Sequence, residues 1–189
     1  MELLEQRILT DGKLLPGGIL KVDSFLNHQM DPKLLQAMAR EFKRLYADVR
    51  VDRVFTIEAS GIAMAILAGL EFDCPVVFAK KSKTKNLSDA LYTAEVPSFT
   101  HGNVNTVVVS KEYLHAGENV LLVDDFLATG AALVGLRSLV EQAGGTVVGA
   151  GIAVEKVFQG GGDKLRAEGL RIESLARIAS MDESGIRFC

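Results

Sequence analysis

The chain has 189 residues, of which 48% are hydrophobic and 24% charged, and its formal net charge at pH 7 is −3. This composition is that of an ordinary soluble globular protein, and the length predicts one domain that spans residues 1–189. We expect neither nucleic-acid binding, which usually needs a basic surface, nor membrane insertion, which needs about 20 consecutive apolar residues.

The N-terminus and the cysteines favour a cytoplasmic protein. The first residues are charged and lack the apolar core of a secretory signal. The two cysteines, Cys74 and Cys189, are isolated, so they make neither a disulfide framework nor a metal site. A reducing cytoplasm is therefore the expected compartment.

Segments with helical and strand periodicity alternate along the chain. A helix is predicted over residues 2–9, and a second begins at Asp31-Pro32, because aspartate is a favoured N-cap and proline a favoured first helical residue. The predicted strands cover residues 53–57, 75–79, 120–123, 147–154 and 171–175. Further helices are predicted over residues 61–70 and 131–143, with a short one after the glycines 160–162. This order predicts an α/β fold: a mostly parallel twisted sheet flanked by helices on both faces.

The polar stretch 80–105 interrupts the alternation. It is rich in lysine at its start and lacks strong helical periodicity. Residues 91–96 can form a strand that pairs with residues 106–110, and we expect this pair to be a β-excursion from the main sheet.

The most informative motif follows the predicted strand 120–123. Asp124 and Asp125 come directly after it, and a run of small residues then leads into a helix. In open α/β sheets, ligands bind beyond the carboxyl ends of the strands, and backbone N–H groups at a helix N-terminus favour an anion. Paired carboxylates can accept hydrogen bonds from sugar hydroxyls or face a hydrated divalent cation. The motif therefore predicts a site for a ribose that bears a 5-phosphate, although an aspartate could instead cap the following helix.

A second turn from strand to helix, Glu58-Ala59-Ser60-Gly61, is expected at the same sheet edge. Ser60 and Gly61 could offer backbone N–H groups to a second anion. Taken alone, this turn fits a serine N-cap for the following helix better than an anion site. Two anion-receptive turns at one edge would suit a ligand with phosphate groups at both ends.

Two further segments carry candidate binding residues. Four lysines lie within residues 80–85, and such a run is usually a solvated loop, but a cationic loop can also close over a pyrophosphate. Lys156 and Phe158 follow the strand 147–154, where an ammonium group and an aromatic ring could hold a flat heterocycle. A surface lysine beside a core phenylalanine would look the same.

The order of apolar strand, acidic pair, two apolar residues, small residue and Thr-Gly resembles the phosphoribosyl pyrophosphate signature of type I phosphoribosyltransferases. The resemblance implies catalytic roles for Asp124 and Asp125 at the ribose. It implies a pyrophosphate loop at Ser60 and Gly61 and a flexible loop from which Lys81 reaches the pyrophosphate. The 5-phosphate loop that it implies consists of Ala128, Thr129, Gly130, Ala131 and Ala132.

Residues 21–29 resemble the hood over the base in bacterial members of this family that use xanthine. This likeness implies a hood made mainly of residues 1–30 plus the C-terminal segment. It also implies base contacts from Leu20 and Asn27 in the hood and from Lys156 and Phe158 below it. Further implications are a homodimer, magnesium bound mainly through the pyrophosphate, no metal site of the protein's own and no organic cofactor.

Two positions depart from the family pattern. Many members have an aspartate at the position of Ala128, where it can take a proton from the base, and a hydroxyl residue at that of Ala132. Alanine can neither take a proton nor offer a hydroxyl group. A DNA-binding regulator with the same fold, or an enzyme for another purine, are the competing interpretations. The lack of an excess of basic residues argues against the DNA-binding regulator. Lys156 and the hood argue against adenine as the base.

Overall fold

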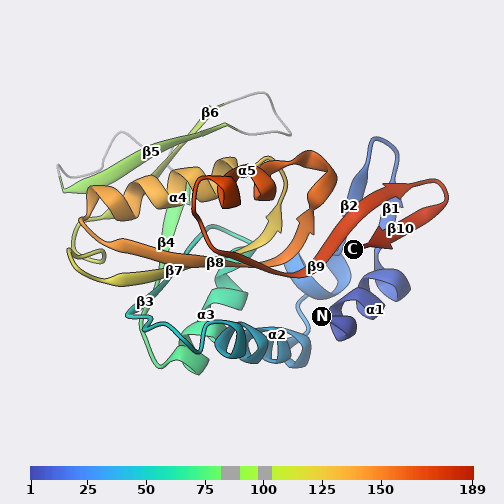
Figure 1. Cartoon of the computed structure of the whole chain (residues 1–189), viewed down its shortest axis with the longest axis horizontal. Helices are drawn as coiled ribbons and strands as arrows, with labels where there is room; N and C mark the ends of the chain where they lie inside the picture. Colours follow the sequence, from blue (N-terminus) through green and yellow to red (C-terminus); the bar gives the residue numbers. More distant parts are fainter. Residues whose placement is uncertain (82–89, 98–103) are drawn as a thin grey trace.

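The computed structural model describes residues 1–81, 90–97 and 104–189. Within these residues the chain forms an eight-stranded sheet with the order β10-β9-β8-β7-β3-β4-β6-β5 (Figure 1). The five strands from β9 to β4 run parallel, and β10, β6 and β5 join antiparallel to their neighbours. The strands of this sheet are β3 (Arg53–Ile57), β4 (Val76–Lys81), β5 (Leu91–Pro97), β6 (Val104–Ser110), β7 (Asn119–Leu127), β8 (Thr146–Lys156), β9 (Ile172–Asp182) and β10 (Gly185–Phe188).

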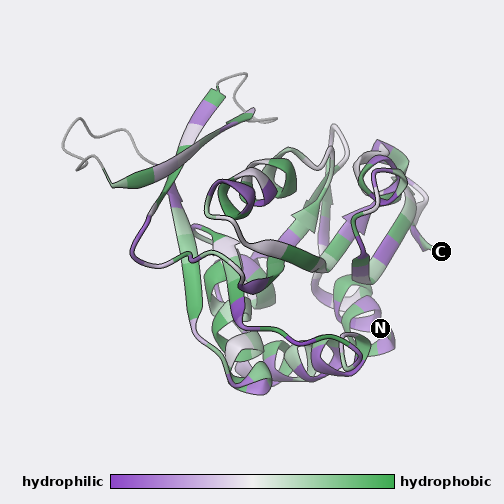
Figure 2. Cartoon of the chain, turned by 60° about the vertical axis from the view of Figure 1, so that its left-hand side comes forward, coloured by the Kyte–Doolittle hydropathy of each residue, from purple (hydrophilic) through white to green (hydrophobic). Residues whose placement is uncertain are grey.

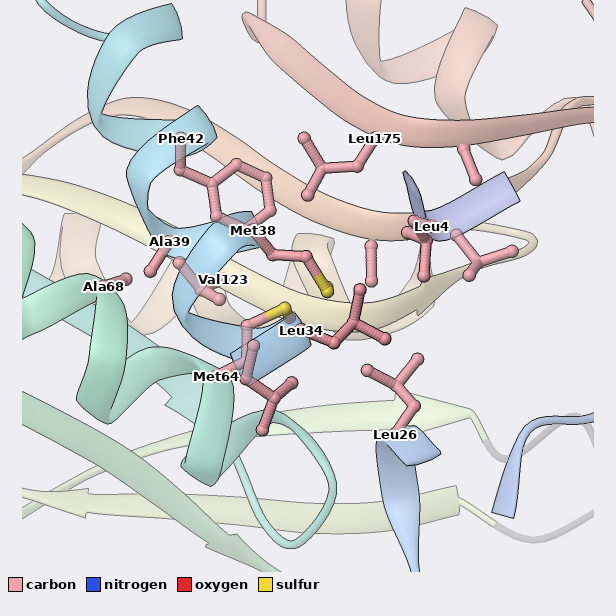
Figure 3. Close-up of a cluster of buried hydrophobic side chains, with 14 of the residues drawn as sticks. Leu4, Leu26, Leu34, Met38, Ala39, Phe42, Met64, Ala68, Val123 and Leu175 are labelled. Atoms are coloured by element: carbon pink, nitrogen blue, oxygen red, sulfur yellow. The ribbon is translucent and has the colours of Figure 1, made fainter. Parts of the chain in front are cut away.

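Helices cover both faces of the sheet, as the sequence predicts. One face packs against α1 (Glu2–Asp11), α2 (Pro32–Leu45) and α3 (Gly61–Phe72). Figure 3 shows part of this cluster, which includes Phe42 of α2, Met64 of α3 and Val123 of the sheet. The other face packs against α4 (Ala131–Gln142) and α5 (Gly161–Ala167). Neighbouring residues of β7 alternate between the two clusters, because successive side chains of a strand point to opposite faces.

The start of α2 follows from the sequence alone. The Asp31 carboxylate accepts hydrogen bonds from the backbone N–H groups of Lys33 and Leu34 at 3.1 and 3.2 Å. Pro32 is the first helical residue, where its missing N–H group costs nothing. The prediction of this helix start is confirmed.

The two largest differences in strand length concern β7 and β9, which are much longer in the structure than predicted. β7 runs through Leu127, so the acidic pair lies inside the strand and not beyond it, and β9 extends from residue 172 to residue 182. The extensions mix polar and apolar residues, so the apolar pattern does not predict them. Pairing with β8 stabilises polar residues in these strands as well as apolar ones. No strand was predicted after residues 171–175, yet β10 follows β9 in the structure.

A hairpin in the first thirty residues was not predicted. Strands β1 (Lys13–Leu15) and β2 (Ile19–Lys21) pair antiparallel around Gly17 and Gly18, whose positive φ angles of 83° and 73° favour glycine. A π-helical turn, η1 (Asp23–Asn27), follows. This hairpin lies next to the β9–β10 hairpin at one end of the molecule, close to both termini (Figure 1).

Strands β5 and β6 pair as predicted, with Leu91 opposite Ser110 and Pro97 opposite Val104. β6 also pairs with the end of β4, so this excursion is attached to the edge of the main sheet. Figure 2 shows this ribbon projecting from the body of the molecule above α4.

Candidate active site

The candidate site lies where β3 and β7 end side by side. The two strands are parallel neighbours, yet the chain leaves β3 through α3 towards β4 and leaves β7 through α4 towards β8, on the opposite side. Such a switch in direction opens a crevice at the carboxyl edge of the sheet, where open α/β sheets bind ligands.

A cleft of about 240 Å³ occupies this crevice. Its wall combines the two turns that the sequence singles out with the acidic pair and the end of β4. The predicted residues that line it are Ser60, Gly61, Lys81, Asp124, Asp125, Ala128, Thr129, Gly130, Ala131 and Ala132. The two anion-receptive turns are therefore parts of one cleft.

The acidic pair is asymmetric. Asp124 is 5% exposed, whereas Asp125 is half-buried, and the backbone N–H of Asp125 donates to Asp124 Oδ1 at 3.0 Å. Burial raises the pKa of Asp124 well above its ordinary value, and the neighbouring Asp125 carboxylate raises it further, while Lys81 acts in the opposite direction. Neither aspartate caps α4, whose N-cap is Gly130, so the helix-capping interpretation is wrong.

The small-residue loop after β7 is shaped by Gly130, which has a φ angle of +85° that side chains rarely adopt. α4 begins at the next residue, and the first N–H groups of a helix have no partner within the helix. Ala131, Ala132 and Leu133 all line the cleft, so the start of α4 forms part of its wall. The loop can therefore bind an anion through its main chain.

The second turn leads into α3 at Gly61. A Cβ atom at Gly61 would overlap the hydroxyl oxygen of Thr56 and lie 3.4 Å from Asp124 Oδ1, which is why this position needs glycine. Ser60 occupies the N-cap position with helical angles but makes no capping hydrogen bond through its side chain. The serine side chain is thus left available to the cleft, and the side-chain capping interpretation is wrong.

Glu58 lines the cleft as well, and the sequence pattern did not predict a role for its side chain. Its carboxylate accepts a hydrogen bond of 2.6 Å from the backbone N–H of Lys81, so it joins the second turn to the end of β4. Only the position of Glu58 at the start of the turn could have indicated this. Lys81 is exposed at the cleft. The rest of the lysine run, and the proposed flexible loop with it, lies mostly in 82–89 and 98–103, outside the described residues.

The predicted base contacts lie beside this cleft. The ammonium group of Lys156, the last residue of β8, donates to the carbonyl oxygen of Gly18 at 3.3 Å and lies 5.7 Å from the centre of the Phe126 ring. Burial lowers the pKa of Lys156. Asn27 Nδ2 donates to Asp125 Oδ2 at 3.4 Å. The hairpin and η1 therefore meet the ends of β7 and β8, although they are far from them in sequence.

The other two predicted base contacts differ in exposure. Leu20 in β2 is only 6% exposed, so little of its side chain can touch a ligand, whereas Phe158 in η2 (Val157–Gln159) is 47% exposed. Phe126, which follows the acidic pair and stands beside Lys156, was missed. It looked like one more apolar residue of the motif.

Residues 1–81, 90–97 and 104–189 contain no group of three His, Cys, Asp or Glu side chains placed to hold a metal ion. Among the helices of the same residues, none has the length and apolar character that crossing a membrane requires.

The fold and the cleft together define a class of α/β proteins that bind phosphorylated ligands at the switch point of a mostly parallel sheet. A profile of the phosphoribosyl transferase domain matches residues 23–172, and the chain belongs to this family. It is 48% identical over 188 residues to the xanthine phosphoribosyltransferases of Bacillus cytotoxicus and Bacillus cereus strain AH187, covering 100% of this chain and 95% of each of those proteins.

Solved structures share the fold. The adenine phosphoribosyltransferase of Giardia lamblia, complexed with 9-deazaadenine, superposes with a TM-score of 0.78 at 23% identity, covering 92% of this chain and 97% of that one. The adenine phosphoribosyltransferase of Rhodothermus marinus gives a TM-score of 0.76 at 20% identity, covering 94% and 99%. At such identities the likeness concerns the fold and not the base.

Proposed function

We propose that this protein is a xanthine phosphoribosyltransferase of purine salvage. It transfers the 5-phosphoribosyl group of phosphoribosyl pyrophosphate to xanthine, giving xanthosine 5′-monophosphate and pyrophosphate, and is thus a pentosyltransferase. The observation that carries the proposal is the single cleft in which the acidic pair, the loop 128–132 and the turn at Ser60 and Gly61 meet. The 48% identity over the whole chain to xanthine phosphoribosyltransferases supports the choice of base.

The ribose and its phosphates are assigned to the cleft. Asp124 and Asp125 hold the 2- and 3-hydroxyl groups and lie near the positive charge that develops on the ring as the bond to pyrophosphate breaks. The main-chain N–H groups of residues 128–132 and the Thr129 hydroxyl bind the 5-phosphate. Ser60, Gly61 and Lys81 bind the pyrophosphate, where the ammonium group stabilises the leaving charge.

The base is assigned to the space between the hairpin and the end of β8. Lys156 donates to the 6-oxo group of xanthine, and this favours an oxo purine over adenine, whose amino group is also a donor. Asn27 and Leu20 contact the base from the hood, and Phe158 stacks on it. The hydrogen bond from Asn27 to Asp125 supports this placement, because it puts the hood next to the ribose site.

Catalysis proceeds without a general base at position 128. Alanine cannot take the proton from the base, so positioning and charge stabilisation carry the reaction. Xanthine is more acidic than guanine or hypoxanthine, and an anionic xanthine needs no proton removed by the enzyme. The pH dependence of kcat/KM for xanthine should then follow the ionisation of the substrate.

The metal ion, the oligomeric state and the compartment are proposed from the likeness to the family. Magnesium bound mainly through the pyrophosphate would neutralise its charge, and the carboxylate oxygens of Asp124 and Asp125 would accept hydrogen bonds from its water ligands. The protein works as one domain, as a homodimer and in the cytoplasm, with residues 1–30 and the C-terminal segment as the hood.

A panel of purine bases tests the proposal. Xanthine, hypoxanthine, guanine and adenine are each offered with phosphoribosyl pyrophosphate and magnesium, and pyrophosphate release is measured. We expect xanthine to be used with the highest kcat/KM. A better rate with adenine would contradict the assigned base, and a shifted band of duplex DNA without any pyrophosphate release would favour a regulator.

A further inference from the structure

The loop 128–132 rests on a second layer of chain. The short helix α5 lies on the same side of the sheet as α4, and its first residue, Gly161, donates its backbone N–H to the carbonyl oxygen of Ala128 at 3.2 Å. The side chain of Leu165 lies against Gly130, where a Cβ atom would be only 2.8 Å from Leu165 Cδ1. The loop is therefore in direct contact with α5 on the side away from the cleft.

The contact at Gly161 leaves no room for a side chain. A Cβ atom there would overlap the carbonyl oxygen of Ala128 and the carbonyl carbon of Thr129, and it would lie 2.6 Å from the backbone nitrogen of Gly130. All three are main-chain atoms, which cannot turn away as the end of a flexible side chain can. Any side chain at Gly161 must displace the loop itself.

An ion pair fixes the position of α5. The Glu155 side chain is fully buried and accepts two hydrogen bonds of 2.7 Å from Arg166 of α5. Gly162 allows this approach, since a Cβ atom there would overlap Glu155 Oε1. Glu155 lies in β8 opposite Leu127, the last residue before the loop. The ion pair thus ties α5 to the strand pair from which the loop emerges.

We propose that Gly161, held in place by the Glu155–Arg166 ion pair, is a positioning residue for the 5-phosphate loop 128–132. This inference rests on the proposed function, because it assumes that the loop binds the 5-phosphate of the substrate. α5 sets the spacing of the loop N–H groups and so controls affinity for the 5-phosphate end. The turn at Ser60 and Gly61 belongs to β3 and α3, so the pyrophosphate end is independent of α5.

Two ligands that each occupy one end of the site test this. Binding of ribose 5-phosphate, and separately of magnesium pyrophosphate, is measured by calorimetry for the wild type and for Gly161→Ala. We expect ribose 5-phosphate to bind about tenfold more weakly or worse, because displacing a binding group by about 1 Å has large effects. Affinity for pyrophosphate should stay unchanged. Lys164→Ala, on the exposed side of α5, is the matched control and should bind both ligands normally.

If Gly161→Ala does not fold, a second variant tests the same positioning role. Arg166→Lys keeps the charge but loses the forked pair of hydrogen bonds that arginine makes with a carboxylate. We expect faster amide hydrogen exchange in residues 128–132 of this variant, unchanged exchange in residues 58–61, and weaker binding of ribose 5-phosphate alone.

The outcomes separate this inference from the proposed function. A wild type that does not bind ribose 5-phosphate overturns the proposed function and, with it, the role of Gly161. Equal binding of ribose 5-phosphate by the wild type and the folded variants overturns only the positioning role. Parallel loss of both ligands also overturns it, because such a loss reports general damage and not a displaced loop.

Discussion

The ammonium group of Lys156 donates a hydrogen bond to the carbonyl oxygen of Gly18, at 3.3 Å, across 138 positions of sequence. Lys156 ends β8, and Gly18 lies in the loop of the β1–β2 hairpin. An ammonium group has three donors, so this contact leaves others for a ligand. The contact brings the hood to the residue that we assign to the 6-oxo group of the base.

Replacing Lys156 with alanine should reduce the preference for xanthine. A hydrogen bond from a charged donor contributes about 1.5–3 kcal/mol, which corresponds to a loss of roughly 10- to 150-fold in kcat/KM for xanthine. Adenine should lose less, since its amino group does not accept from lysine. The ratio of kcat/KM for the two bases is the measurement, and Lys33→Ala, at an exposed position of α2, is the control. An unchanged ratio would place the base elsewhere.

Neutralising both aspartates should abolish turnover while the fold remains. Asp124→Asn with Asp125→Asn removes the charge that stabilises the positive ring in the transition state, and we expect kcat to fall by about 100-fold or more. Circular dichroism should stay native, because asparagine has nearly the same shape. Near-normal activity in the folded double variant would contradict the ribose assignment.

The buried Asp124 carboxylate should make stability depend on pH. The pKa of this carboxyl is raised in the folded state. Over the pH range just above 3.8 the folded protein therefore binds more protons than the unfolded chain. The stability that this group contributes falls as pH rises through that range. The variant Asp124→Asn should therefore be more stable than the wild type at pH 7. The difference should vanish as pH falls to 3.8. Urea unfolding of both proteins across this range is the test, and a less stable variant at pH 7 would show that the charge is well compensated.

An ion pair at the start of β3 should make stability depend on pH in the opposite direction. Arg53 donates to the Glu118 carboxylate at 2.6 and 2.8 Å, and these hydrogen bonds lower the pKa of Glu118 to about 2. A lowered pKa contributes stability above 4.5 that is lost as pH falls from 4.5 towards 2. We expect Glu118→Gln to lose about 2 kcal/mol at pH 7 and less at pH 3.

The control for this variant is Glu112→Gln, in the exposed turn between β6 and β7. It should leave the free energy of unfolding unchanged at both pH values. Activity of Glu118→Gln should also stay normal, because the pair lies far from the cleft residues. A loss that is the same at pH 3 and pH 7 would argue against an electrostatic cause.

Removing the Thr129 hydroxyl should weaken the binding of phosphoribosyl pyrophosphate. Because Ala132 offers no hydroxyl, Thr129 is the side-chain donor that we assign to the 5-phosphate. Thr129→Ala should raise KM for phosphoribosyl pyrophosphate about tenfold, while Thr129→Ser keeps the hydroxyl and stays close to wild type. KM for xanthine should not change. Thr146→Ala, exposed at the far end of β8, is the control.

The cleft shows which parts of a site can be predicted locally. The strand, acidic pair and Thr-Gly run are contiguous, and so are the residues of the turn at Gly61, so their chemistry was visible before the fold was known. Glu58 was different, because its role comes from a hydrogen bond to Lys81, 23 positions away. Phe126 and Gly161 are similar, since their neighbours are distant in sequence.

The sequence by itself determined the alternation of helices and strands, the start of α2 at Asp31 and the segments that build the two turns, because periodicity and capping depend on residues a few positions apart. The tertiary structure decided that β7 continues through the acidic pair, that β9 and β10 form a hairpin beside β1 and β2, and that Asn27 meets Asp125. These features depend on pairing and packing between distant segments, whose energies no local pattern of residues records.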